Sequence, residues 1–367
     1  MEHRRTTLTD VARQARVSTA TVDRVLNARG GVKERTRARV IGAAVEAGYL
    51  SSAEREQVAS AGAVTTQPVS LDFVLPGGAN TFMAMLASHL RQQAALFAAV
   101  DVRVRIVSGF GPDELASALH NLAGHSGGVG VIAVDHPTVR EGIGDLVRAG
   151  TPLLTLVSDI SNVATIGYVG IDNRMAGRLA GYLLGRFVGR AEGGVALFAG
   201  ALAYRGHEER EMGFRHVLRE RFPNLRITVH REIQEDSARA YAETCSVLET
   251  CPDLVGLYNI GAGNRGIGAA LRDSGRAGTV AFIGHDLSEH TRRLLLTGTM
   301  DAVLDQNPAE EARQAIACLS AVARGLPCPP CPPLSVVPVF TENIPMTARL
   351  LEELGLSVRP ERREPVG

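Results

Sequence analysis

From Val69 onward the sequence alternates between short apolar runs and amphipathic stretches, and this alternation limits the possible folds more than any other feature. The apolar runs occupy residues 69–75, 102–107, 130–134, 153–157, 195–199, 227–230, 254–259, 280–284 and 302–304. Nearly all of them are followed by a stretch with helical periodicity. Such an order is typical of right-handed βαβ units, so it predicts an α/β fold of parallel sheets with helices on both faces.

Nine strands are more than one sheet usually holds, and residues 166–170 break the alternation in the middle of the chain. We therefore expect residues 69–367 to form a domain of two α/β lobes. The first lobe should span about residues 69–165 with part of 306–334, and the second about 166–305 with part of 335–350. A cleft between two such lobes is a common place for a small ligand to bind.

The first fifty residues have a different pattern, which predicts three short helices. The first starts near Thr7, the second is capped by Ser18 and carries Val22 and Val25 on one face, and the third runs over residues 34–47. A helix, a tight turn and a second helix form the helix-turn-helix arrangement, in which the second helix enters the DNA major groove. Residues 51–68 are small and polar and are expected to form a linker or hinge.

The charge distribution supports a DNA-binding head. The whole chain balances 39 basic against 39 acidic residues, but residues 1–50 contain ten basic and five acidic ones, so the head carries 10 − 5 = +5 and the remainder −5. A basic head on a mildly acidic body suggests a nucleic-acid module joined to another domain.

Within the head, Thr19, Ala20 and Arg24 are expected to face base edges, and Arg24 can bind guanine through two parallel hydrogen bonds. The residues expected to contact phosphates are Thr6, Thr7, Ser18, Thr21, Asn27 and Arg35. The alternative is a helical hairpin whose arginines form only a solvated surface.

Residues 7–27, together with 32–37 and the pair Gly48 and Tyr49, closely resemble the head of the lac-repressor (LacI/GalR) family of transcription regulators. The resemblance implies a homodimeric repressor that binds a pseudo-palindromic operator in double-stranded DNA. Asp23 stands where the family usually has serine, and Lys33 replaces the usual cap of the third helix. In the linker, Val58 aligns with a leucine that the family inserts into the minor groove.

The body resembles the effector domain of the same family, which is similar to periplasmic sugar-binding proteins. The resemblance implies a sugar or polyol effector held by seven residues: Asn80, Phe82, Asp159, Arg210, Asn259, Asp286 and Gln306. Carboxylates, amides, an arginine and an aromatic ring suit a hydroxyl-rich ligand. The alternatives are turn or N-cap roles for Asn80 and Asp159, and a core position for Phe82.

The glycines Gly261, Gly263 and Gly266 form a GxGxxG motif after the run 254–259, with Asp286 twenty residues beyond the last glycine. This context is also typical of a dinucleotide site, in which pyrophosphate lies on a helix N-terminus. We favour a sugar effector, with these glycines serving turns and close packing; an NAD(H)-sensing regulator and a sugar-binding protein without a regulatory role are the alternatives.

No catalytic motif such as HExxH or GxSxG occurs, so we expect no enzyme activity, cofactor or metal. The five cysteines follow no framework spacing, and Cys328 and Cys331 of the only CxxC motif are interpreted as incidental thiols, because no second CxxC lies nearby. Without an apolar leader or long apolar run, the protein is expected to be cytoplasmic and nucleoid-associated, with no membrane partner.

Overall fold

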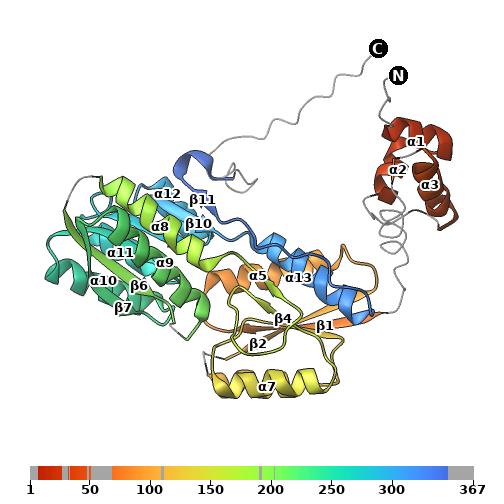
Figure 1. Cartoon of the computed structure of the whole chain (residues 1–367). Helices are drawn as coiled ribbons and strands as arrows, with labels where there is room; N and C mark the ends of the chain where they lie inside the picture. The colour runs from red at the N-terminus through yellow and green to blue at the C-terminus, as the bar shows by residue number, and fades with distance from the viewer. Residues whose placement is uncertain are drawn as a thin grey trace, which may run out of the picture. The chain divides into compact units, whose positions relative to one another are not determined.

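The computed structural model of the chain describes residues 7–26, 32, 34–47, 49–50, 68–108, 111–189, 192–201 and 203–345. These residues fall into two compact units, a head within residues 1–68 and a body made of most of the chain from Val69 onward. Figure 1 colours the chain by residue number, with the helices of the head in red. Each is described by itself.

The head contains the three predicted helices, α1 (Leu8–Ala15), α2 (Thr19–Leu26) and α3 (Glu34–Glu46). Helix α1 ends at Arg16, whose φ of 51° lies in the left-handed region and turns the chain sharply toward α2. Ser18 Oγ accepts a hydrogen bond from the backbone N–H of Thr21 at 3.2 Å and so caps α2. The helices bury a small apolar core whose members include Val11, Ala15, Val22, Val25, Val40 and Ala44.

The first lobe of the body is built on a parallel sheet of five strands in the order β2-β1-β3-β4-β5. The strands are β1 (Val69–Pro76), β2 (Val100–Val107), β3 (Gly128–Val131), β4 (Leu153–Leu156) and β5 (Tyr168–Val169). Three helices connect them: α5 (Thr81–Ala94), α6 (Pro112–His120) and α7 (Pro137–Arg148). The predicted alternation of strands and helices is confirmed here.

The second lobe has a six-stranded sheet in the order β11-β10-β9-β8-β6-β7, in which only β11 runs antiparallel to its neighbour. Its strands are β6 (Gly193–Ala199), β7 (Leu225–Glu232), β8 (Leu254–Asn259), β9 (Ala281–His285), β10 (Ala302–Asp305) and β11 (Val337–Val339). Its helices are α8 (Asn173–Val188), α9 (Arg205–Arg221), α10 (Ser237–Thr250), α11 (Asn264–Asp273) and α12 (Glu289–Leu296), with a short 3-10 helix at Thr341–Asn343.

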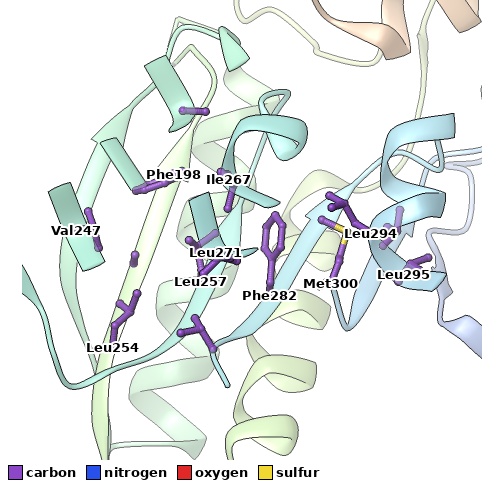
Figure 2. Packing of buried hydrophobic residues seen from close by; sticks show 14 of the residues in the cluster. Phe198, Val247, Leu254, Leu257, Ile267, Leu271, Phe282, Leu294, Leu295 and Met300 are labelled. Atoms are coloured by element: carbon purple, nitrogen blue, oxygen red, sulfur yellow. The ribbon is translucent and has the colours of Figure 1, made fainter. Parts of the chain in front are cut away.

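One face of this second sheet packs against α10, α11 and α12. Figure 2 shows Phe198, Leu257 and Phe282 of the strands beside Ile267 and Leu271 of α11, in a cluster that also contains Met300 and Leu294. Parallel strands buried on both faces become nearly continuous apolar runs in the sequence, which is why these strands were recognisable there.

The chain passes between the lobes at three places, and the first lies later than the sequence suggested. Strand β5 pairs with β4 through Tyr168 and Val169, so the crossing follows Ile171 rather than residue 165. A strand of two residues is too short to form a recognisable apolar run. The second crossing follows β10, after which α13 (Pro308–Ala323) packs on α5 and on the first sheet (Figure 1). The third lies between Leu334, which bridges to Ile171, and β11.

Helices α8 and α9 pack so closely that their backbones touch through glycine. A Cβ atom on Gly177 of α8 would lie 1.9 Å from the carbonyl oxygen of Arg210 in α9, and one on Gly213 of α9 would lie 2.1 Å from the carbonyl oxygen of Arg174. The absence of these two side chains therefore sets the distance between the helices and holds α9 against the sheet. The position of Arg210 depends on this packing.

We predict that Gly177→Ala destabilises the body, because the added methyl group meets backbone atoms that cannot rotate away. Overpacking of this kind costs about 1–3 kcal/mol or more. The control is Gly144→Ala in α7, where a Cβ would meet only the flexible end of Arg148, and where alanine favours the helix by about 0.5–1 kcal/mol. Denaturant unfolding measures both; equal stability of the two variants would contradict the prediction.

Candidate ligand-binding site between the lobes

A cavity that is partly open to solvent lies between the two lobes of the body. The first lobe contributes Asn80, Phe82, Met83, Ile132, Val157 and Ser158. The second lobe contributes Tyr204, Gly206, His207, Arg210, Glu235, Gly261, Asp286 and Gln306. Most of these residues follow the carboxyl ends of strands, where parallel α/β sheets place their ligand sites.

Arg210 is the central cation of this cavity, and it is 3% exposed. Its Nε donates to Asn173 Oδ1 at 2.7 Å, Nη1 to the carbonyl of Ile260 at 2.9 Å, and Nη2 to Gln306 Oε1 at 2.8 Å. A guanidinium has five N–H groups, so these bonds to described residues leave two for a ligand. The side chain is thus fixed before any ligand arrives.

Gln306 connects Arg210 to Asp286. Its Nε2 donates to Asp286 Oδ1 at 2.7 Å while its Oε1 accepts from Arg210, so the amide orientation is defined at both ends. Asp286 itself has a φ of 69°, a left-handed conformation in which its backbone N–H donates to Leu304 O. Burial raises the pKa of Asp286 to about 7, and Arg210 and Gln306 act in the opposite direction.

A hydrogen bond joins the lobes across the cavity. Asn80 Nδ2 of the first lobe donates to Glu235 Oε2 of the second at 2.8 Å, while Asn80 Oδ1 accepts from the backbone N–H of Phe82 and caps α5. Glu235 is 5% exposed, and burial raises its pKa, whereas the bond from Asn80 lowers it. The amide therefore holds the two lobes together at the ligand site.

Two histidines near the cavity are neutral at pH 7. Burial lowers the pKa of His207 to about 3, and the charge of Arg210 adds to this effect. Its Nδ1 lies 2.9 Å from the carbonyl oxygen of Ala201. Burial also lowers the pKa of His285 well below its usual value, and its Nε2 lies 2.7 Å from the hydroxyl of Tyr258. His285 is thus a buried histidine with a structural partner.

A further acid, Glu311 of α13, is fully buried near this group of charges. Neither of its carboxylate oxygens has a hydrogen-bond partner among the described residues. Burial raises its pKa well above the usual range, and the charge of Asp286 raises it further, while Arg210 opposes both. Burial therefore raises the pKa of all three acids near Arg210, and the charge of Arg210 opposes that shift in each of them.

The structure brings five of the seven predicted effector residues together: Asn80, Phe82, Arg210, Asp286 and Gln306. Asp159 and Asn259 do not line the cavity. Asp159 Oδ1 accepts from Thr155 Oγ1 at 2.7 Å. Asn259 is fully buried and its Nδ2 donates to the carbonyls of Gly261 and Ala262 and to Asn264 Oδ1, so it stabilises its own turn.

Sequence reasoning missed Glu235, His207 and Tyr204. The available signal for Glu235 was its place in the loop between an apolar run and the following helix. The other two have no distinguishing pattern, because only the approach of the lobes brings them to the cavity.

The glycines of the GxGxxG motif serve packing. Gly263 has a φ of 98°, which favours glycine, and begins α11. A Cβ on Gly266 would lie 1.9 Å from the carbonyl oxygen of Ser237, at the contact between α11 and α10. The backbone conformation and the helix contact therefore explain why glycine is needed at positions 263 and 266, and no bound pyrophosphate is required.

In the head, Thr19, Ala20 and Arg24 are exposed on α2, on the side away from the buried Val22 and Val25. Thr7, Ser18 and Arg35 are also exposed. Thr21 is half-buried, and its hydroxyl lies 2.9 Å from that of Ser18. Thr6, Asn27, Lys33 and Val58 lie outside the described residues, so these predictions stay untested.

The fold and the cavity define a two-lobed α/β binding protein with a helical head. A family model described as a periplasmic binding protein domain matches residues 71–327, and one described as bacterial regulatory proteins of the lacI family matches residues 7–52. The chain belongs to the family of periplasmic binding protein domains through its body, and its head matches the domain of lacI-family regulatory proteins, as the sequence resemblance indicated.

The chain is similar to catabolite control protein A of Priestia megaterium, with 28% identity over 173 residues. This match covers 46% of the chain and 48% of that relative, about half of its length. The fold is similar to GanP, a glucose-galactose binding protein from Geobacillus stearothermophilus, with a TM-score of 0.69, 22% identity, and coverage of 76% and 99% of the two chains.

A second similar structure is a solute-binding protein from Burkholderia graminis in complex with D-arabinose, with a TM-score of 0.70 and 20% identity, covering 76% of this chain and 97% of that one. At these identities the two structures establish the fold of the body. In the part of the chain that the structure describes, no helix is long and apolar enough to cross a membrane.

Because the folded pKa of Asp286 lies above its unfolded value, the folded state binds the proton more tightly between about pH 4 and 7. The stability that this proton contributes is present at low pH and is lost as pH rises through about 7. One pKa unit corresponds to about 1.4 kcal/mol. We therefore predict that the free energy of unfolding of the wild type falls by roughly 2–4 kcal/mol more than that of Asp286→Asn between pH 4 and pH 8.

Denaturant unfolding across this pH range measures the difference. Asparagine keeps an oxygen that can accept from Gln306, so the substitution removes the titration without removing that bond. Asp113→Asn, at an exposed position of α6, controls for the loss of a carboxylate. Parallel pH profiles of wild type and Asp286→Asn would disprove the assignment.

Proposed function

We propose that the protein is a sequence-specific DNA-binding transcription regulator, a repressor, whose effector is a small neutral sugar or polyol bound between the lobes. The observation that carries the proposal is the interlobe cavity, in which Arg210, Gln306 and Asp286 form one fixed hydrogen-bonded row. The head of the lacI type on the same chain supports the regulatory role.

The chemistry of the cavity suits hydroxyl groups, which both donate and accept hydrogen bonds. Arg210 and Asn80 offer N–H donors, Asp286 and Glu235 offer carboxyl oxygens, and Phe82 borders the cavity with an aromatic ring.

An effector between the lobes would act by changing their closure. Asn80 and Glu235 already join the lobes, so a ligand that replaces or reinforces this bond alters the relative stability of the open and closed forms. In a homodimer, that change would alter the spacing of two heads on a pseudo-palindromic operator in double-stranded DNA. Such a regulator would work in the cytoplasm, at the nucleoid.

An NAD(H)-sensing regulator is the second candidate, and the packing roles of Gly263 and Gly266 argue against it. A sugar-binding protein without a regulatory role is the third, and it leaves the lacI-type head without a function. Stabilisation of the protein by NAD(H), but by no sugar or polyol, would favour the second candidate over our proposal.

The effector assignment predicts that Arg210→Lys weakens sugar binding by about 10-fold to 100-fold, because a lysine cannot keep the three protein contacts and also donate to a ligand. Calorimetric titration with glucose, galactose, arabinose, allose and common polyols measures this. Arg215→Lys, on the same helix but paired with Glu211 at the surface, is the control. Wild-type affinity in a folded Arg210→Lys variant would contradict the assignment.

The DNA-binding assignment predicts that Arg24→Ala loses discrimination at one base pair, with a cost of about 1–3 kcal/mol, and keeps most of its salt-dependent non-specific binding. Selection from a random duplex library, followed by binding measurements at several salt concentrations, tests it. Arg13→Ala, an exposed arginine of α1, is the control. If no duplex sequence is selected by wild type with or without sugars, the regulatory proposal fails.

A further inference from the structure

Three cysteine sulfurs come together in the first lobe, which corrects the expectation that Cys328 and Cys331 are incidental thiols. Cys318 lies on α13 and is fully buried, and the other two lie in the loop that follows this helix. The three Sγ atoms all lie within 4.8 Å of one another. The group could not be recognised in the sequence, because Cys318 lies thirteen residues before Cys331 and on a helix.

The loop holds its two thiols in a restricted backbone. Prolines occupy positions 327, 329, 330, 332 and 333, on both sides of each cysteine. Each proline fixes φ and reduces the number of conformations that the free chain can adopt. Cys331 Sγ also lies 3.3 Å from the carbonyl oxygen of Pro329, and Cys318 Sγ lies 3.9 Å from the same atom. The loop therefore loses little conformational entropy when it brings the sulfurs close together.

A disulfide alone does not account for this arrangement. Cys318 and Cys331 are paired as a disulfide in the structure, but their Cα atoms are 7.6 Å apart, whereas disulfides usually have Cα separations of about 4.4–6.8 Å. In the reduced protein, a metal ion with metal–sulfur bonds of about 2.3 Å would hold the sulfurs about 4 Å apart, which accommodates the longer Cα separation. It also gives Cys328 a role, which a single disulfide does not.

We propose that Cys318, Cys328 and Cys331 form a binding site for a thiophilic metal ion, and that the cuprous ion fits it best. Thiolate ligands select soft ions such as Cu(I) and Zn(II). Structural zinc sites almost always have four protein ligands, and in the part of the chain that the structure describes no fourth histidine, cysteine or carboxylate joins these three. A group of three thiolates therefore favours Cu(I) over zinc.

The site lies just before the third crossing between the lobes. Leu334, three residues beyond Cys331, bridges to Ile171 at the first crossing, and the chain then enters β11 of the second sheet. A bound ion would tie this crossing segment to α13, which packs on the first sheet. Metal binding is thus expected to stabilise the folded body.

The test uses the full chain, purified and kept reduced under anaerobic conditions, and titrated with Cu(I) against a chromophoric Cu(I) chelator. In parallel it is titrated with Zn(II) against a chromophoric zinc chelator. We expect one Cu(I) per chain, a raised melting temperature on loading, and tighter competition for Cu(I) than for Zn(II). Cys328→Ser and Cys331→Ser are each expected to weaken Cu(I) binding by at least about 100-fold.

The control variants are Cys245→Ser and Cys251→Ser, two cysteines outside the group, which should leave Cu(I) binding unchanged. Because Cys318 is fully buried, the test rests on the two half-buried loop cysteines, and circular dichroism of the metal-free variants checks their folding. Unchanged Cu(I) affinity in folded Cys328→Ser and Cys331→Ser would overturn the proposal. So would a Cys318–Cys331 disulfide that persists under the reducing conditions of the titration.

Discussion

The buried guanidinium of Arg210 is the interaction on which the ligand site depends. It joins α9 to α8 through Asn173, to the end of β8 through Ile260, and to the end of β10 through Gln306. A buried cation is tolerated only where its hydrogen bonds are satisfied, so these neighbours are fixed together with it. The close glycine contact between α8 and α9 makes this arrangement possible, because it brings the backbone of Arg210 against α8.

The acids around Arg210 are in an environment that penalises their charge. Asp286, Glu235 and Glu311 all have raised pKa values because they are buried, and the charge of Arg210 acts against this effect in each of the three. The same groups make stability depend on pH.

Much of the architecture was predictable because a buried strand or helix has a recognisable pattern of apolar residues within its own stretch of sequence. Strands such as β6 and β8 are buried on both faces and form apolar runs, and the periodicity of α1 and α2 identifies the head. The predicted boundary of the first lobe was wrong because β5 has only two residues, too few to form a recognisable apolar run. Because β5 belongs to the first sheet, the first crossing between the lobes lies beyond the expected boundary. Asn259 lies outside the cavity for a different reason, since its amide nitrogen donates to the backbone of its own loop.

The sequence by itself determined the class of fold and the division into head and body, because these depend on periodicity, and its resemblance to a known family implied five residues of the cavity. Only the tertiary structure decided that Glu235 reaches Asn80 across the lobes and that Cys318 joins Cys328 and Cys331. Asn80 and Glu235 are 155 residues apart, and Cys318 lies on a helix beside the loop of its partners. Such contacts depend on how separate elements pack, and no local pattern in the chain encodes that packing.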